Sequence, residues 1–299
     1  MKFVKFRQEL PLHIMILPTV ILLFVFAYIP MFGIVIAFEK YVPTLGVFHS
    51  KWVGWGNFAY LMNLPNTWQV LYNTVYIALL KLIGGIIVPI VFALLLNEVR
   101  GKVFKRSVQT IIYLPHFLSW VILAGIFLDI LSPSTGVVNS LIVAMGGKPI
   151  FFLGSAQWFP NVMVVTDIWK EFGFGTIVYL AALTNVDPNL YEASAIDGAG
   201  RWKQTWHVTL PGILPIVVLM TVLALANVLN AGFDQIFNMY SPSVYSTGDI
   251  IDTFVYRLGL KEAQFGPAAA EGLFKSVVSF AFIMTSWKLA DKLAGYRVF

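Results

Sequence analysis

Residues 188–215 read PNLYEASAIDGAGRWKQTWHVTLPGILP, a polar, glycine-containing segment between two strongly apolar runs. The segment contains Glu192-Ala193-Ser194, and three residues separate Ser194 from Gly198. Nine residues separate Gly198 from Val208, and Thr209 and Leu210-Pro211 follow. Because the flanking runs are long and apolar, we interpret this stretch as a polar connection between two apolar helices.

The composition indicates a protein that lies in a membrane. Hydrophobic residues make up 58% of the 299 residues, charged residues only 12%, and the mean hydropathy is +0.78. A soluble domain has about 25% charged residues and would lack the polar surface to cover itself at this composition. The absence of cysteine excludes disulfides, thiolate metal sites and cysteine nucleophiles. The net charge of +5 forms no dense basic face, which argues against nucleic-acid binding.

Six apolar runs are long enough to cross a hydrocarbon core about 30 Å thick. They lie at about 12–38, 74–96, 108–130, 161–183, 212–232 and 268–290. We therefore expect an all-α membrane protein with six transmembrane helices. The polar connection that contains Glu192 falls between the fourth and fifth spans.

The distribution of Lys and Arg predicts the orientation. Twelve of these residues fall in the two termini and in the connections after the second and fourth spans, whereas five fall in the other connections. The positive-inside rule therefore predicts that both termini and the connection at 184–211 are cytoplasmic. The outer connections are long and hold several tryptophans, as expected near a membrane interface.

The local sequence of the connection predicts two short helices. Asp187-Pro188 is a helix-start signal, because Asp caps exposed N–H groups and proline suits the first helical position. We expect a helix to about Asp197, a turn at Gly198 and Gly200, and a second helix that ends near Leu210, before Pro211 opens the fifth span. A compact element of this kind passes on motion that a flexible loop would absorb.

Ionisable residues inside spans are costly and are therefore functional candidates. Lys81 lies in the second span without an obvious local partner, and Lys170 is expected to pair with Asp167 in the fourth. Glu271 and Lys275 are expected to pair in the sixth span. A polar translocation path is one interpretation, and structural pairing between helices is the other. The candidate path residues are Lys81, Asp167, Trp169, Lys170, Glu171 and Asn227.

Motifs for catalysis and metal binding are missing. Gly146-Gly147-Lys148 lacks the Ser/Thr and the upstream glycine of a phosphate-binding loop, so the chain is not expected to hydrolyse ATP itself. The four histidines are dispersed without metal-ligand spacing, and no GxSxG sequence presents a serine nucleophile. We expect neither a catalytic site nor a metal site.

The spacing of the 192–211 connection resembles the coupling loop of membrane permease subunits of ATP-binding-cassette (ABC) importers, EAA-x3-G-x9-I-x-LP, with Ser194 and Val208 as conservative departures. Asn73-Thr74, Leu114-Pro115 and Gly136-Val137-Val138-Asn139 are also similar to this class. Ile196-Asp197-Gly198-Ala199 resembles the carbohydrate-uptake branch. The stretch at 252–257 and the closing Ala294-Gly295-Tyr296-Arg297 are most similar to its polysaccharide and oligosaccharide permeases.

This resemblance implies a type I importer permease fold and a role in oligosaccharide import by alternating access. It implies a location in a bacterial cell membrane. The implied partners are a second permease subunit, which is a different chain in this subgroup and therefore favours a heterodimer, two ATPase subunits that bind ATP-Mg, and an extracytoplasmic solute-binding protein. No cofactor is expected on this chain. The expected domains are 1–72 (tail, first helix and outer loop), 73–291 (transmembrane domain with the coupling loop at 187–211) and 292–299 (cytoplasmic tail).

The resemblance also assigns residues to the contact with the ATPase subunit. Glu192 would meet a basic residue there, Ala193 and Ala199 allow close approach, and Leu210-Pro211 would join the loop to the fifth span. The residues that we assign to coupling are Glu192, Ala193, Ser194, Asp197, Gly198, Ala199, Leu210 and Pro211.

Two other functions fit parts of the sequence. An ion-coupled secondary sugar carrier would use Asp167 and Glu171 as ion sites, but it leaves the 192–211 spacing unexplained. A membrane-embedded enzyme would need a catalytic constellation that the sequence lacks. An ordinary amphipathic loop is the structural alternative for the connection itself.

Overall fold

The computed structural model describes residues 2–294, which divide into two compact units. The first comprises residues up to Thr67 together with Val255–Phe274, and the second comprises Trp68–Phe254 with the residues from Lys275. Residues 295–299 of the expected tail, with the Gly295-Tyr296-Arg297 part of the resemblance, lie outside the described residues. The domain boundaries expected at 72 and 291 stay predictions.

The first unit begins with a long apolar helical stretch, whose side chains from Leu10 are largely exposed. A two-stranded antiparallel sheet follows, in which Glu39 pairs with Trp52 and Lys40 with Lys51. The elements are α1 (Lys2–Leu23), η1 (Phe24–Tyr28), α2 (Ile29–Met31), η2 (Phe32–Phe38), β1 (Glu39–Lys40), α3 (Gly46–His49), β2 (Lys51–Trp52), α4 (Gly56–Asn63) and η6 (Arg257–Lys261).

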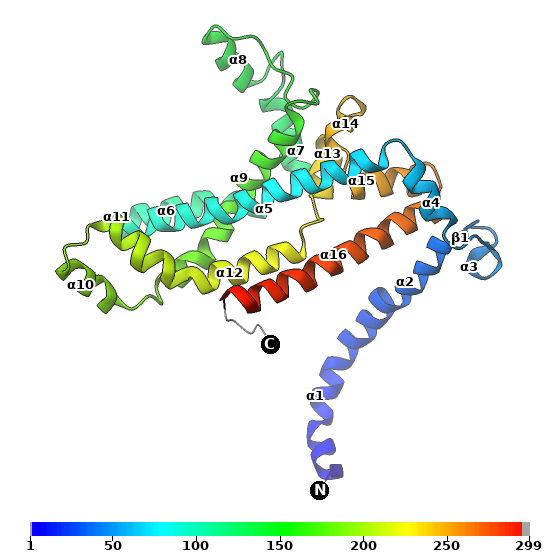
Figure 1. The fold of residues 1–299 in the computed structure, drawn as a ribbon, viewed down its shortest axis with the longest axis horizontal. Helices are drawn as coiled ribbons and strands as arrows, with labels where there is room; N and C mark the ends of the chain where they lie inside the picture. Colours follow the sequence, from blue (N-terminus) through cyan, green and yellow to red (C-terminus); the bar gives the residue numbers. More distant parts are fainter. Residues whose placement is uncertain (1, 295–299) are drawn as a thin grey trace. The chain divides into compact units, whose positions relative to one another are not determined.

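The second unit is helical, and its centre is α9, which packs against α6 and α12 (Figure 1). Its core joins apolar side chains of α9, α5 and α12, with Phe159, Met163 and Tyr179 of α9 almost fully buried. The elements are α5 (Thr67–Glu98), α6 (Lys102–Tyr113), η3 (Leu114–Phe117), α7 (Trp120–Ile130), α8 (Val137–Ala144), α9 (Phe159–Leu183), α10 (Pro188–Ile196), α11 (Arg201–Gln204), η4 (Thr205–Thr209), α12 (Leu210–Ala226), α13 (Phe233–Met239), η5 (Pro242–Val244), α14 (Tyr245–Gly248) and α15 (Ile251–Tyr256). The last helix, α16 (Phe265–Ala294), begins in the first unit and continues into the second.

The all-α fold is confirmed, but the count of six spans is not reproduced. Four helical stretches of the described residues are long and apolar enough to cross a membrane: Leu10–Phe38, Thr67–Glu98, Arg201–Ala226 and Phe265–Ser286. A bent pair of helices, Lys102–Phe117 and Trp120–Ile130, raises the number to five. The expected fourth span is the 25-residue helix α9, which falls outside this set because three ionisable side chains interrupt its apolar surface.

The expected span at 108–130 contains a sharp bend, where the chain turns by 104° between α6 and α7. Pro115 lies in the 3-10 turn at the bend, and Ser119 caps the new helix by accepting a hydrogen bond from the Ile122 N–H at 3.4 Å. Proline removes one helical hydrogen bond, and a serine cap allows the helix to restart in a new direction. The bend is therefore encoded locally.

Candidate functional site

Lys81 on α5 is the polar centre of the second unit, and its side chain is buried. Its Nζ donates to Asp167 Oδ1 on α9 at 3.2 Å, to the carbonyl of Ala231 at 2.7 Å, and to Gln235 Oε1 on α13. A buried ammonium without such acceptors would carry a penalty of about several kcal/mol. None of these acceptors is local in sequence, as expected for Lys81: all three come from distant segments, which the local sequence does not reveal.

Gln235 and Gly232 hold the Lys81 ammonium in place. The fully buried Gln235 donates from Nε2 to the Met163 carbonyl at 2.9 Å and to Thr166 Oγ1 at 2.7 Å, so its oxygen remains available to Lys81. Gly232 has a φ of 96°, and a Cβ there would lie 2.8 Å from the Lys81 Nζ. Any other residue would strain the backbone and press on the ammonium.

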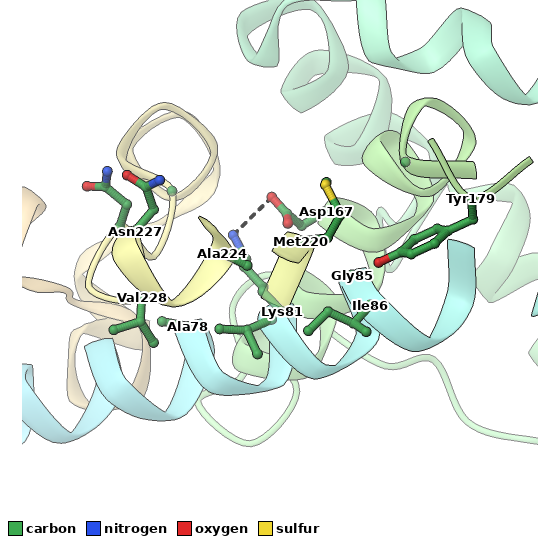
Figure 2. Close-up of a pocket in the computed structure, with 14 residues that line it drawn as sticks. Ala78, Lys81, Gly85, Ile86, Asp167, Tyr179, Met220, Ala224, Asn227 and Val228 are labelled. Carbon is green, nitrogen blue, oxygen red and sulfur yellow. Dashed lines mark hydrogen bonds and ion pairs between the residues drawn. The ribbon is translucent and has the colours of Figure 1, made fainter. Parts of the chain in front are cut away.

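Lys81 and Asp167 line a cavity of about 290 Å³ in the second unit (Figure 2). The figure shows Lys81 rising from α5 toward Asp167 on α9, with the dashed line marking their ion pair. Tyr179, Asn227 and Asn230 add the other polar side chains of the lining, and the rest of it is apolar or glycine. Apolar walls with few polar groups are typical of small-molecule binding pockets.

A second lysine lies beside this cavity. Lys275 on α16 donates to Asn230 Oδ1 at 2.9 Å and pairs with Asp252 Oδ1 at 2.5 Å. The expected pair of Lys275 with Glu271 is therefore wrong, because Lys275 finds a carboxylate and an amide on other segments. Among residues 2–294, no hydrogen-bond partner reaches the buried Glu271 Oε1.

The other candidates on α9 lie away from the cavity lining. Lys170 Nζ pairs with Glu171 Oε1 at 2.7 Å and donates to the His116 carbonyl at 3.0 Å. Glu171 Oε2 lies 2.6 Å from His116 Nδ1. Trp169 is 43% exposed and meets Phe127 edge to face.

The expected pair of Lys170 with Asp167 is consequently wrong, since Lys170 binds Glu171 and Asp167 binds Lys81. Asp167 lies one turn before Lys170 on α9, but Asp167 pairs with a residue of α5 whereas Lys170 pairs with its neighbour on α9. Of the six candidate path residues, the cavity brings together Lys81, Asp167 and Asn227.

The polar connection forms the expected helix–turn–helix. Asp187 caps α10 by accepting a hydrogen bond from the Asn189 N–H at 2.9 Å, and Pro188 is the first helical residue. Gly198 follows with a φ of 77°, a left-handed conformation that favours glycine. The chain then enters α11 at Arg201.

The sequence predicts that the second helix of the connection ends near Leu210, but it continues beyond this residue. The π turn η4 joins α11 to α12, so that a helical stretch runs from Arg201 to Ala226. Pro211 lies at the start of α12, where the wider turn before it accommodates the missing proline N–H. The connection therefore continues directly into a candidate membrane span.

Two side-chain hydrogen bonds tie the two halves of the connection together. Gln204 Nε2 donates to Ser194 Oγ at 3.1 Å, and Ser194 Oγ donates to the Tyr191 carbonyl at 2.9 Å. The Tyr191 hydroxyl lies 3.0 Å from Thr209 Oγ1. These bonds join α10 to α11 and η4 across the glycine turn.

Most of the assigned coupling residues lie at the surface. Glu192, Ala193, Asp197, Gly198 and Pro211 are exposed. The partly buried members are Ser194, Ala199 and Leu210. Three residues of these sites were not expected from the sequence, because their hydrogen-bond partners lie from 10 to 154 residues away: Gln204, Tyr191 and Gln235. The one local signal was a polar Gln235 close to Gly232 after an apolar run.

Comparisons with known proteins place these features in one family. Residues 85–284 match the family described as binding-protein-dependent transport system inner membrane component. The polygalacturonan/rhamnogalacturonan transport system permease protein YteP of Bacillus subtilis is 44% identical over 99% of this chain and 92% of its own length. The protein LplB of the same organism is 42% identical over 96% of this chain and 90% of its own length.

Solved structures agree with the sequence comparison. A chain of a bacterial ABC transporter involved in the import of the acidic polysaccharide alginate superposes with a TM-score of 0.90 at 38% identity, over 97% of this chain and 98% of that one. A chain of an alginate transporter in complex with an alginate pentasaccharide-bound periplasmic protein gives a TM-score of 0.89 at 37% identity, over 97% of both chains. The chain therefore belongs to the family of binding-protein-dependent transport system inner membrane components, and it is a permease subunit of an ABC importer rather than an enzyme or an ion-coupled carrier.

Proposed function

We propose that this permease imports fragments of an acidic polysaccharide. YteP is named for polygalacturonan and rhamnogalacturonan transport, and the superposable importer takes up alginate, so two relatives with different acidic glycans support the proposal. The cavity lined by Lys81, Asp167 and Asn227 is the part of this chain that we assign to the substrate path. Its volume of about 290 Å³ is at the lower limit of ligand pockets, about 300–1,000 Å³, which fits a path completed by a second subunit.

The energy for transport enters through the connection at 187–211. The exposed Glu192 and the turn at Gly198 would contact a separate ATPase subunit that carries ATP-Mg, and we keep Ala193, Ser194, Asp197, Ala199, Leu210 and Pro211 in this surface. The helical continuity from Arg201 to Ala226 supports this role, because it links the turn to a candidate membrane span without a flexible segment. A ligand shifts a conformational equilibrium only through different affinities for the two states, so nucleotide must change how the ATPase holds this turn.

The proposed assembly contains this chain, a second and different permease subunit, two ATPase subunits and an extracytoplasmic binding protein. The chain would lie in a bacterial cell membrane with both termini in the cytoplasm, in line with the twelve basic residues assigned to that side. The proposed cycle is alternating access, in which ATP binding brings the coupling turns together and opens the path to the binding protein.

Uptake into proteoliposomes tests the proposed function. The purified importer, with its binding protein outside and ATP inside, should accumulate labelled oligogalacturonate or oligoalginate, and a protonophore should have no effect. The same glycans with their carboxylates reduced to alcohols are the matched control for substrate charge, and we expect weaker uptake of them. Uptake that continues without ATP and collapses with the protonophore would contradict the importer mechanism. Equal uptake of the reduced glycans would contradict the acidic substrate.

A further inference from the structure

The first unit holds a second pocket, of about 690 Å³, that the transport path does not use. Its polar lining includes Glu39, Lys40 and Gln264, and its aromatic lining consists of Tyr41, Tyr60 and Phe265. Every residue of the lining belongs to the first unit.

Glu39 is the unusual member of this lining, since it is 96% buried and no hydrogen-bond partner reaches its Oε2 among residues 2–294. Its backbone is fixed, because Asn57 Nδ2 donates to its carbonyl at 2.9 Å and a Cβ on Gly266 would lie 2.6 Å from the same oxygen. The strand alternation turns Glu39 inward and leaves the adjacent Lys40 exposed. A buried carboxylate without a partner is costly, so this position favours a cationic hydrogen-bond donor.

The pocket lies at a boundary between apolar and polar chain. The apolar stretch Leu10–Phe38 ends one residue before Glu39, and Phe265 in the lining is the first residue of the candidate span Phe265–Ser286. Two ends of hydrocarbon-length segments therefore meet the same pocket, and its tyrosines are typical of the interfacial region. Lipid headgroups occupy this depth of a bilayer.

We propose that this pocket binds the headgroup of an amine-containing phospholipid, with the primary ammonium donating to Glu39 and the phosphate meeting Lys40. Glu39 and Lys40 both line this pocket, so it offers a buried carboxylate and an exposed ammonium to the opposite charges of a zwitterionic headgroup. A divalent metal is a poorer match, because the described residues contain no group of three or more His, Cys, Asp or Glu side chains that could hold one. A choline headgroup fits less well, since its quaternary ammonium has no N–H to donate.

Lipid retention by the purified importer tests this site. The assembled importer is placed in nanodiscs with equal amounts of phosphatidylethanolamine and phosphatidylcholine, which carry the same net charge. The lipids that stay bound to the importer after it is released from the nanodisc are identified by native mass spectrometry. We expect the wild-type protein to retain the ethanolamine lipid at least about ten-fold over the choline lipid, which corresponds to about 1.4 kcal/mol and is close to the lower end for a hydrogen bond to a charged group. Glu39→Gln should reduce the ratio to about one.

Two variants make the result specific. Glu262→Gln removes an exposed carboxylate from the same unit and should leave the ratio unchanged. Lys40→Gln should lower the retention of both lipids without changing their ratio, and it gives a second readout if Glu39→Gln fails to assemble. Equal retention of the two lipids by the wild-type protein would overturn the proposal, as expected if a side chain of another subunit fills the pocket. An unchanged preference in Glu39→Gln would overturn it as well.

Discussion

Lys81 holds three separate segments together, and its acceptors determine what a substitution should do. The ammonium satisfies Asp167, the Ala231 carbonyl and Gln235 at once, and Gln235 in turn anchors to α9. The same side chain lines the cavity of the proposed substrate path. A structural role and a proposed functional role therefore coincide in Lys81.

We predict that Lys81→Met impairs both uptake and stability. The variant leaves Asp167 and Gln235 without their partner, which we expect to lower the free energy of unfolding by about 1–3 kcal/mol. We would measure uptake in proteoliposomes and the midpoint temperature of thermal unfolding of the purified importer. Lys148→Met, at an exposed position, is the matched control and should change neither. Normal uptake with an unchanged midpoint would show that the pairing is unimportant.

Gly198 gives a prediction about backbone conformation. Its φ of 77° is unfavourable for L side chains, yet a Cβ there would meet nothing within 4 Å. Gly198→Ala should therefore cost about 1–2 kcal/mol through the backbone alone, and it should lower ATP-driven uptake by displacing the turn. Gly200→Ala is the matched control, because Gly200 has an ordinary φ of −70° and equally open surroundings. Equal uptake by the two variants would contradict the assigned role of the left-handed turn.

The α10–α11 connection moves as one rigid body only if the hydrogen bonds between its two halves persist. Ser194 and Gln204 are bonded across the turn, as are Tyr191 and Thr209. We predict that Ser194→Ala and Gln204→Leu each lower the sugar imported per ATP hydrolysed, and that the double variant is no worse than either single one. This non-additivity follows because both changes remove the same bond. Fully additive losses would show that the two residues act separately.

The packing of α6 on α9 gives a prediction about a close helix contact. A Cβ on Gly173 would lie 1.9 Å from the backbone oxygen of Ile112, so the helices can approach this closely only with glycine. Gly173→Ala should force α6 and α9 apart and lower the thermal midpoint of the importer. Gly125→Ala in α7, where a Cβ meets nothing within 4 Å, should be neutral or slightly stabilising. A stable Gly173→Ala importer with normal uptake would contradict this account of the contact.

Local signals predicted the features that depend on neighbouring residues. The Asp187 cap, the Gly198 turn and the apolar stretches were all expected, because caps, left-handed turns and helix lengths are encoded over a few residues. The continuous helix through Pro211 was not expected, and the size of the 104° bend at Pro115 was not predicted, since hydropathy alone gives neither. The turn at Gly198 could therefore be located from the sequence, but its continuous helical junction with α12 could not.

The ion pairs of the candidate site needed the tertiary structure. The expected pairs, Lys170 with Asp167 and Lys275 with Glu271, were both local in sequence, and both were replaced by other partners. Helical spacing shows which side chains can meet on one helix, but it does not decide between competing carboxylates: Lys170 pairs with its neighbour Glu171, and Lys275 with Asp252 on α15. The partners of Lys81 lie 86 to 154 residues away, beyond any local rule.

We propose that the energy for transport reaches this permease at one turn, the one that contains Glu192 and Gly198. The family match, the superposition on an alginate importer and the surface position of Glu192 agree with this account. Reversal of the charge at Glu192 should disturb the contact with the ATPase and leave the fold intact, because the side chain is exposed.

The most direct test is the number of sugar molecules imported per ATP hydrolysed by proteoliposomes that contain the Glu192→Lys importer. We predict that this ratio falls at least ten-fold, either with continued ATP hydrolysis or with loss of the ATPase subunits from the complex. Glu262→Lys, an exposed charge reversal in the first unit, should keep the wild-type ratio. A wild-type ratio in Glu192→Lys would contradict the assignment of this turn as the entry point for ATP energy.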